Sequence, residues 1–128
     1  MTLIIAEAGV NHNGDFNLAK ELIYAAKDAG ANIIKFQTFI TELGISKNTP
    51  IAPYQKQNTD YKTQYELIKK LEFSFEQFML LKEYAEELEI EFLSTAFDLP
   101  SLNFLNKIGV KRFKIPSGEI NNLPYLRQ

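Results

Sequence analysis

The chain has 128 residues and a mass of 14.7 kDa. With 45% hydrophobic and 23% charged residues it has the composition of one ordinary globular domain. Fourteen basic and sixteen acidic side chains give a formal net charge of -2, which argues against nucleic acid or a membrane surface as a partner. Zero cysteines and a single histidine exclude thiolate chemistry and a histidine-rich metal site.

Targeting and membrane-spanning segments are not expected. No apolar run approaches the ~20 residues that a membrane span needs. The N-terminus also lacks the basic region and the small-residue cleavage site of a signal peptide. We therefore expect a soluble protein of the cytoplasm.

The first 37 residues predict a strand, a helix and a second strand. The apolar run over residues 2–8 is closed by Gly9, and Asp15 is placed as the N-cap of a helix that ends before Gly30. Residues 32–37 form a second short run of β-branched and aromatic residues. Elements in this order make a βαβ unit, so we expect the two strands to be parallel.

Residues 38–63 show no helical or strand periodicity and contain several Pro, Gly, Asn and Asp residues. A connection of roughly 25 residues exceeds the ~12–15 at which long loops become uncommon unless they are functional. We therefore expect this loop to face a substrate.

Helical spacing resumes over residues 65–71. Ser74 and Gln77 then form a capping box, which predicts the start of another helix. The β-branched and aromatic run over residues 91–95 predicts a third strand after it. The pattern of strand followed by helix is thus repeated.

The remaining residues repeat it again. Asp98 or Ser101 can cap a helix that ends at Gly109, and residues 111–115 predict a fourth strand. A further helix is expected over residues 123–128. The order of elements is βα throughout.

Strands that alternate with helices predict a parallel α/β fold, either an open doubly wound sheet or a closed (β/α)₈ barrel. Period-two alternation puts Lys35 and Gln37 on one side of the second strand, and Leu93 and Thr95 on one side of the third. Polar residues late in the strands favour the barrel, which accepts them inside its carboxyl-terminal mouth. Since a barrel needs ~250 residues, we interpret residues 1–128 as the N-terminal part of one, with about its first four βα units.

Side chains at the strand ends, most of them polar, are the candidate functional residues. The carboxyl ends of all strands of a barrel meet at one face, where active sites lie. Two lysines and a serine there would hold a phosphate or a carboxylate, and two glutamates would bind hydroxyls or exchange protons. The set consists of Glu7, Lys35, Gln37, Thr95, Phe97, Asp98, Lys114, Ser117 and Glu119.

A structural role is open for several of these residues. A lysine in a strand can lie at a sheet edge or extend to solvent. Glu7 can cap a turn or pair with a neighbouring lysine, and Asp98 is expected as a helix cap. His12 can order a turn through its ring nitrogens or line the site.

Four motifs carry a family resemblance. They are IAEAGVNHNG at residues 5–14, KFQT at 35–38, FLSTAFD at 92–98 and KIPSGE at 114–119. In this order they resemble the strand-end motifs of the sialic acid synthase family, the bacterial N-acetylneuraminate synthases, and four ordered motifs are far more specific than one. Two positions depart from the usual pattern, with Ala96 in place of proline and Pro116 in place of a small residue.

The resemblance implies a (β/α)₈ barrel followed by a small antifreeze-like domain in a homodimeric protein. It also implies a transferase of carbohydrate biosynthesis that condenses phosphoenolpyruvate with N-acetylmannosamine to give N-acetylneuraminate and phosphate. The family uses a divalent metal, Mn²⁺ or Mg²⁺, whose ligands would lie beyond Gln128. No metal ligand is therefore expected in residues 1–128, and this part alone is expected to be inactive.

The resemblance also assigns roles to individual residues. Four of them, Glu7, Lys35, Lys114 and Glu119, are expected to take part in the chemistry. By substrate, the implied contacts are Lys35, Lys114 and Ser117 for phosphoenolpyruvate and Gln37, Asn58 and Glu119 for the amino sugar, with Glu7, Thr95 and Phe97 as further active-site positions.

Alternative functions stay open. The motifs at 35–38 and 117–119 resemble neuraminate and legionaminate synthases more than pseudaminate synthases, and a legionaminate synthase would use a 2,4-diacetamido hexose. A Schiff-base aldolase would also place a lysine at a barrel mouth, but desolvated and not paired with phosphate. A non-catalytic sugar-phosphate binding module would use the same groups without turnover.

Overall fold

A computed structural model describes residues 2–50 and 61–128. Three parallel strands, β1 (Ile5–Gly9), β2 (Ile33–Thr38) and β3 (Glu91–Ala96), form one sheet in the order β1-β2-β3. A 3-10 turn spans Ser117–Glu119. The helices are α1 (Phe16–Asp28), α2 (Thr41–Gly44), α3 (Gln64–Leu71), α4 (Phe75–Glu87), α5 (Leu99–Lys107) and α6 (Leu123–Leu126).

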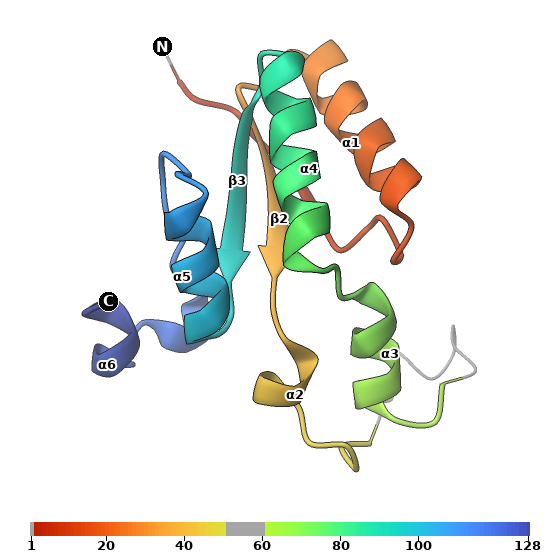
Figure 1. The fold of residues 1–128 in the computed structure, drawn as a ribbon, viewed down its shortest axis with the longest axis vertical. Coiled ribbons are helices and arrows are strands. Elements are labelled where there is room, and N and C mark those ends of the chain that lie inside the picture. Colours follow the sequence, from red (N-terminus) through yellow and green to blue (C-terminus); the bar gives the residue numbers. More distant parts are fainter. Residues whose placement is uncertain (1, 51–60) are drawn as a thin grey trace.

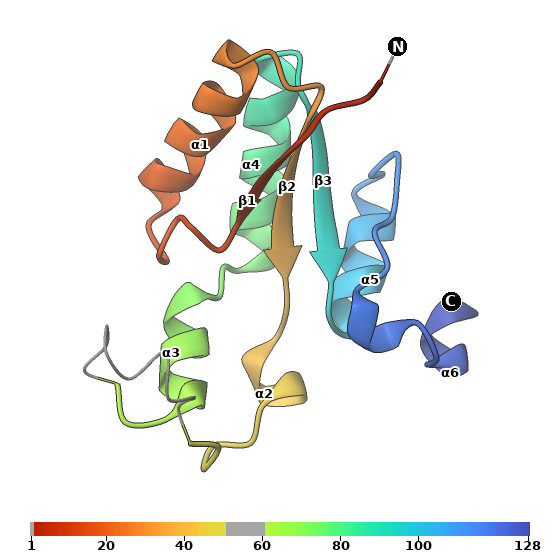
Figure 2. The same ribbon diagram turned by 180° about the vertical axis from the view of Figure 1, so that it is seen from behind.

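Two helices cover one face of the sheet, and two others lie beyond the ends of its strands. Figure 1 shows α1 and α4 side by side over one face of the sheet, with α5 beside β3. Helices α2 and α3 lie beyond the arrowheads of β2 and β3 in both views (Figures 1 and 2). Within the described ranges, no helix has the length and apolarity to cross a membrane.

The predicted helix starts are confirmed. The Asp15 carboxylate accepts hydrogen bonds from two backbone N–H groups at the start of α1. Ser74 and Gln77 form the expected capping box of α4, and Asp98 caps α5 by accepting from the N–H of Ser101 at 2.8 Å. Each cap satisfies donors that a helix leaves unpaired in its first turn, which stabilises the helix by about 1 kcal/mol.

The hydrophobic core lies between the sheet and helices α1, α4 and α5. Ile34 and Phe36 of β2 are buried in it, as are Phe92 and Ala96 of β3. Because successive side chains of a strand alternate between its faces, Lys35 and the residues in phase with it point to the other face. This confirms the predicted alternation.

The predicted fourth strand is wrong for most of its length. Over residues 111–115 the structure has only one isolated parallel bridge, between Thr95 and Lys114. Phe113 and Ile115 are 45% and 38% exposed, so the described residues do not give them the burial that stabilises a strand. The predicted long loop likewise contains the short helix α2.

Candidate active site

The strand register brings predicted site residues together on the face opposite the core. Glu7 pairs with Lys35, and Gln37 pairs with Thr95, as neighbours on adjacent strands. An isolated bridge from Thr95 to Lys114 places Lys114 on the other side of Thr95 from Gln37. The register thus places Glu7 beside Lys35, and Thr95 between Gln37 and Lys114.

Lys35 and Glu7 form an ion pair through Nζ and Oε2. The Lys35 side chain is only 13% exposed, whereas that of Glu7 is 50% exposed. Pairing with a lysine was one of the open alternatives for Glu7, and the structure adopts it. The pair holds the Lys35 ammonium in a fixed direction beside a partly solvated carboxylate, where an incoming anion would compete for the same donor.

Gly9 leaves the space that two polar side chains occupy. Its φ of +55° is in the left-handed region, and a Cβ there would lie 3.1 Å from Glu7 Oε1 and 3.4 Å from Gln37 Nε2. The sequence indicated Gly9 only as the end of a strand. Its role beside the site depends on the register between β1 and β2, which a single sequence does not reveal.

A cleft of about 350 Å³ opens at the carboxyl ends of β2 and β3. Gln37, Phe97 and Glu119 are among its lining residues, so three predicted site residues share one cavity. Most of the remaining wall is apolar and comes from the loop after β1, from α3 and from the residues around α2. These apolar residues are Val10, Phe39, Ile40, Ile45 and Ile68.

Helices α2 and α3, which wall the cleft, are joined by a polar network that the sequence did not indicate. Glu72 Oε2 accepts hydrogen bonds from the N–H and the hydroxyl of Thr41 at 2.8 and 2.6 Å. Lys69 pairs with Glu42 at 3.0 Å and with Glu72 at 2.8 Å. The hydrogen bond from Lys69 is the largest cause that lowers the pKa of Glu42 to about 2.

His12 orders the loop after β1. Its ring is fully buried, Nδ1 accepts a hydrogen bond from the N–H of Gly14 at 3.1 Å, and the ring stacks on Phe73 with centroids 4.1 Å apart. Of the two roles open for His12, the structure shows the first, the ordering of a turn. Phe73 follows α3, so the stack also ties the loop after β1 to the element that carries part of the cleft wall.

The buried state of His12 makes stability depend on pH. Burial lowers the pKa of His12 below 6.5, so the unfolded chain binds more protons just below that pH. The contribution of His12 to the free energy of unfolding is therefore expected to be fully present above pH 6.5. It is expected to be lost as the pH falls from 6.5 through the folded-state pKa. Urea unfolding of the full-length protein from about pH 5 to about pH 7.5 measures this.

The variant His12→Phe keeps a ring for stacking and cannot bind a proton. Its stability is expected to vary less with pH across that interval than the stability of the wild type. An unchanged slope in His12→Phe would show that other groups cause the pH dependence.

The other predicted residues are placed as follows. Asp98 is a cap, and its second oxygen accepts from the N–H of Ile40 at 2.8 Å. Glu119 Oε2 accepts from Asn122 Nδ2 at 2.5 Å. Thr95 is buried, Phe97 is 42% exposed, and Lys114 and Ser117 are exposed. Asn58 lies outside the described residues.

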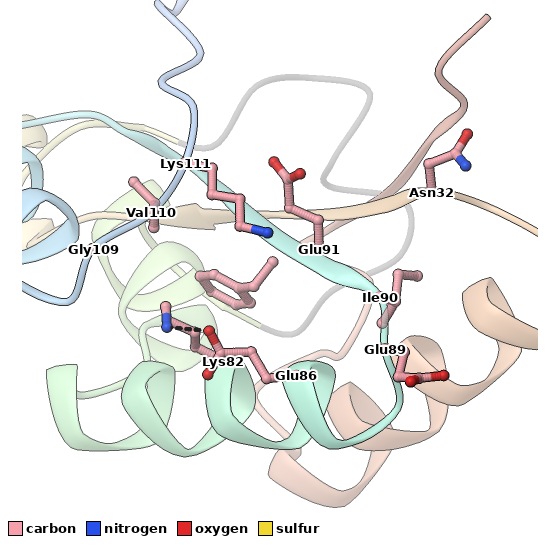
Figure 3. A pocket seen from close by; sticks show the side chains of 10 residues that line it. Asn32, Lys82, Glu86, Glu89, Ile90, Glu91, Gly109, Val110 and Lys111 are labelled. Atoms are coloured by element: carbon pink, nitrogen blue, oxygen red, sulfur yellow. Dashed lines mark hydrogen bonds and ion pairs between the residues drawn. The ribbon is translucent and has the colours of Figure 1, made fainter. Parts of the chain in front are cut away.

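A second cleft, of about 360 Å³, lies near the amino end of β3 (Figure 3). It is lined by Lys82 and Glu86, which form an ion pair on α4, and by Lys111 from the segment after α5. Among the predicted site residues that the structure describes, none lines it. Since βα folds place their active sites at the carboxyl ends of the strands, we take the cleft at Gln37 as the candidate site.

A metal would need ligands from elsewhere. Across residues 2–50 and 61–128, no group of three or more His, Cys, Asp or Glu side chains could hold a metal ion. The described residues therefore do not fit a resident metal by themselves, and none of the chemistry below passes through one.

Parallel strands with polar groups gathered at their carboxyl ends are the arrangement of a βα barrel, and known proteins agree. A crystal structure of the N-acetylneuraminic acid (sialic acid) synthetase from Leptospira borgpetersenii, in complex with citrate, matches with a TM-score of 0.81 and 43% identity over 97% of this chain and 39% of that one. The α/β fold is thus part of a (β/α)₈ barrel, as predicted. The chain belongs to the NeuB family, and the sequence pattern of this family matches residues 22–128.

Two curated relatives extend the comparison. The chain is 58% identical to the N,N'-diacetyllegionaminic acid synthase of Legionella pneumophila, over 97% of this chain and 35% of that protein. It is 40% identical to the human N-acetylneuraminate-9-phosphate synthase, over 98% of this chain and 35% of that protein. The chain thus spans about a third of the length of these relatives. The predicted resemblance to sialic acid synthases is confirmed.

Proposed function

We propose that residues 1–128 are the N-terminal part of the barrel domain of a synthase that condenses phosphoenolpyruvate with an N-acetylated amino sugar and releases phosphate. The rest of the barrel and an antifreeze-like domain would belong to the same full-length protein. The observation that carries the proposal is the convergence of Glu7, Lys35, Gln37 and Thr95 on one face at the strand ends. Family membership agrees with it.

Each side chain has a role in this proposal. Lys35 and Lys114, with the hydroxyl of Ser117, bind the phosphate and carboxylate of phosphoenolpyruvate through charge-assisted hydrogen bonds. Glu7 orients the Lys35 ammonium through its ion pair. Gln37 and Glu119 contact the amino sugar from the cleft that they line.

The reaction forms one carbon–carbon bond and one carbon–oxygen bond, the latter to water, and breaks the carbon–oxygen bond to phosphate. The terminal enol carbon of phosphoenolpyruvate attacks the aldehyde carbon of the open-chain sugar, and the aldehyde oxygen takes up a proton. Water then adds to the cationic carbon that carries the phosphate. Loss of phosphate from that carbon leaves the 2-keto acid.

Two sugars are candidates, N-acetylmannosamine and a 2,4-diacetamido hexose. Identity of 58% to a diacetyllegionaminic acid synthase, against 40% to a neuraminate-9-phosphate synthase, favours the second. The ion pair of Lys35 with Glu7 argues against a Schiff-base aldolase, because that lysine must be uncharged to attack a carbonyl.

The test is phosphate release by the purified full-length protein. Release is expected only when phosphoenolpyruvate and an acetamido sugar are both present, and borohydride with a keto substrate is expected to leave the activity intact. Binding of phosphoenolpyruvate without turnover would favour a non-catalytic module. Inactivation by borohydride would favour the aldolase.

A further inference from the structure

The short helix α2 cannot hold its own position. It has only four residues, far too few for a helix that is stable in water by itself. None of these residues belongs to the hydrophobic core, and Figure 2 shows α2 beyond the end of β2. Yet the chain around it supplies Phe39, Ile40 and Ile45 to the wall of the cleft at the strand ends. The position of this wall therefore depends on contacts from other elements.

Two carboxylates from other elements bind successive backbone N–H groups at the start of α2. Asp98 Oδ2 accepts from the N–H of Ile40 at 2.8 Å. Glu72 Oε2 accepts from the N–H of Thr41 at 2.8 Å and from its hydroxyl at 2.6 Å. Ile40 has no side-chain oxygen that could cap the helix, so the two carboxylates satisfy donors that α2 leaves unpaired. We call Glu72 and Asp98 the α2 clamp.

Both members of the α2 clamp are themselves fixed by contacts that do not involve α2. The other oxygen of Asp98 caps α5 by accepting from the N–H of Ser101 at 2.8 Å. Phe73, which follows Glu72, is 4% exposed and stacks on His12 with ring centroids 4.1 Å apart. The clamp thus ties a segment without stability of its own to α5 and to the hydrophobic core.

The Glu72 carboxylate is charged at neutral pH although its side chain is only 18% exposed. Burial acts to raise the pKa of Glu72, but hydrogen bonds from Lys69 and Thr41 outweigh it and hold the pKa below the ordinary value of 4.5. Charged acceptors make hydrogen bonds roughly twice as strong as neutral ones. The net stabilisation from a partly buried ion pair is nevertheless small, because desolvation offsets the attraction. Such a pair is better suited to fixing a geometry than to stabilising the fold.

We infer that Glu72 and Asp98 are positioning residues of the proposed reaction, which hold the start of α2 and thereby set the position of the cleft wall. This step rests on the proposed function, in which the amino sugar binds in this cleft. Neither carboxylate is among the described residues that line the cleft, and no lysine is among them either. A loosened wall is thus expected to weaken binding of the sugar and to leave binding of phosphoenolpyruvate unchanged.

Two substitutions of Thr41 form a matched pair for the test. Thr41→Val keeps the shape of the buried side chain and removes the hydroxyl that donates to Glu72. In the full-length enzyme it is expected to raise the KM for the acetamido sugar by about threefold to tenfold, which corresponds to the loss of one hydrogen bond. The KM for phosphoenolpyruvate is expected to stay unchanged. Thr41→Ser keeps the hydroxyl and is expected to stay close to the wild type in both constants.

Hydrogen exchange of the backbone N–H groups of Ile40 and Thr41 tests the α2 clamp without any substrate. Glu72→Gln removes the charge of the acceptor and is expected to speed exchange at Thr41 severalfold and to raise the KM for the sugar. The control is Glu86→Gln, since Glu86 also pairs with a lysine but lies on α4 at the second cleft. This change is expected to leave the exchange rates and both KM values unaltered.

The outcomes separate the inference from the proposed function. If Thr41→Val and Glu72→Gln leave the KM for the sugar unchanged, or raise both KM values equally, the two carboxylates do not position the sugar site and the inference is overturned. If the wild type releases no phosphate with any acetamido sugar, it is the proposed function that fails. The exchange rates then still decide the clamp, because faster exchange in Glu72→Gln supports it and unaltered exchange overturns it.

Discussion

Replacement of Lys35 by Met in the full-length protein is expected to raise the KM for phosphoenolpyruvate by about tenfold to a hundredfold, and the KM for the sugar much less. Methionine keeps most of the length of the side chain and removes a charged hydrogen bond worth about 1.5–3 kcal/mol. It also leaves the Glu7 carboxylate without the ammonium that it pairs with. Steady-state kinetics with each substrate varied in turn measures both constants.

The ion pair predicts that changes at its two partners do not add. Glu7→Gln in the Lys35→Met background removes the unpaired negative charge and is expected to recover part of the loss, since residues in contact are coupled. Lys82→Met is a suitable control because Lys82 pairs with Glu86 on α4 and lies at the second cleft. If the KM for the sugar rose and that for phosphoenolpyruvate did not, Lys35 would belong to the sugar site.

The parts of this fold that were predictable from sequence are those that depend on near neighbours. Asp15 and Ser74 cap helices because their side chains reach N–H groups two or three residues later. Alternation within β2 likewise fixes that Lys35 and Gln37 share a face, whatever the strand pairs with. Such features need no knowledge of distant contacts.

Features that depend on distant contacts were not predictable. The network of Thr41, Glu72 and Lys69 joins residues 31 apart in sequence, and no local pattern indicates which carboxylate meets which amide. The predicted fourth strand failed for a related reason. Strand propensity is a local property of the sequence, but a strand also needs a neighbouring strand to pair with and side chains that bury its faces. Lys114 has a single bridge, to Thr95.

The candidate site contains features that were predictable from sequence and features that were not. The four motifs singled out Glu7 and Lys35 as site residues, and the register shows that they pair with each other. The apolar wall was not visible in the sequence, because Val10 and Ile68 are 58 positions apart and line the same cleft only through the fold. Cleft walls of this kind come from the packing of loops, which sequence periodicity does not describe.

Gly14→Ala is expected to be the most destabilising small substitution in the loop after β1. Gly14 has a φ of +77°, and a Cβ there would lie 2.2 Å from the carbonyl oxygen of Lys70. The left-handed conformation costs an alanine about 1–2 kcal/mol, and the displacement of α3 adds about 1–3 kcal/mol of overpacking. Urea unfolding of the full-length variant gives the total loss in the free energy of unfolding.

Gly30→Ala separates the two contributions to that loss. Gly30 has nearly the same backbone conformation, with a φ of +80°, but nothing lies within 4 Å of its Cβ position. Its loss is expected to stay at about 1–2 kcal/mol, the conformational part alone. Because the loop that Gly14 closes also carries Val10, Gly14→Ala should raise the KM for the sugar while Gly30→Ala should not. Equal losses of stability in the two variants would mean that the close approach to Lys70 is not a constraint on this loop.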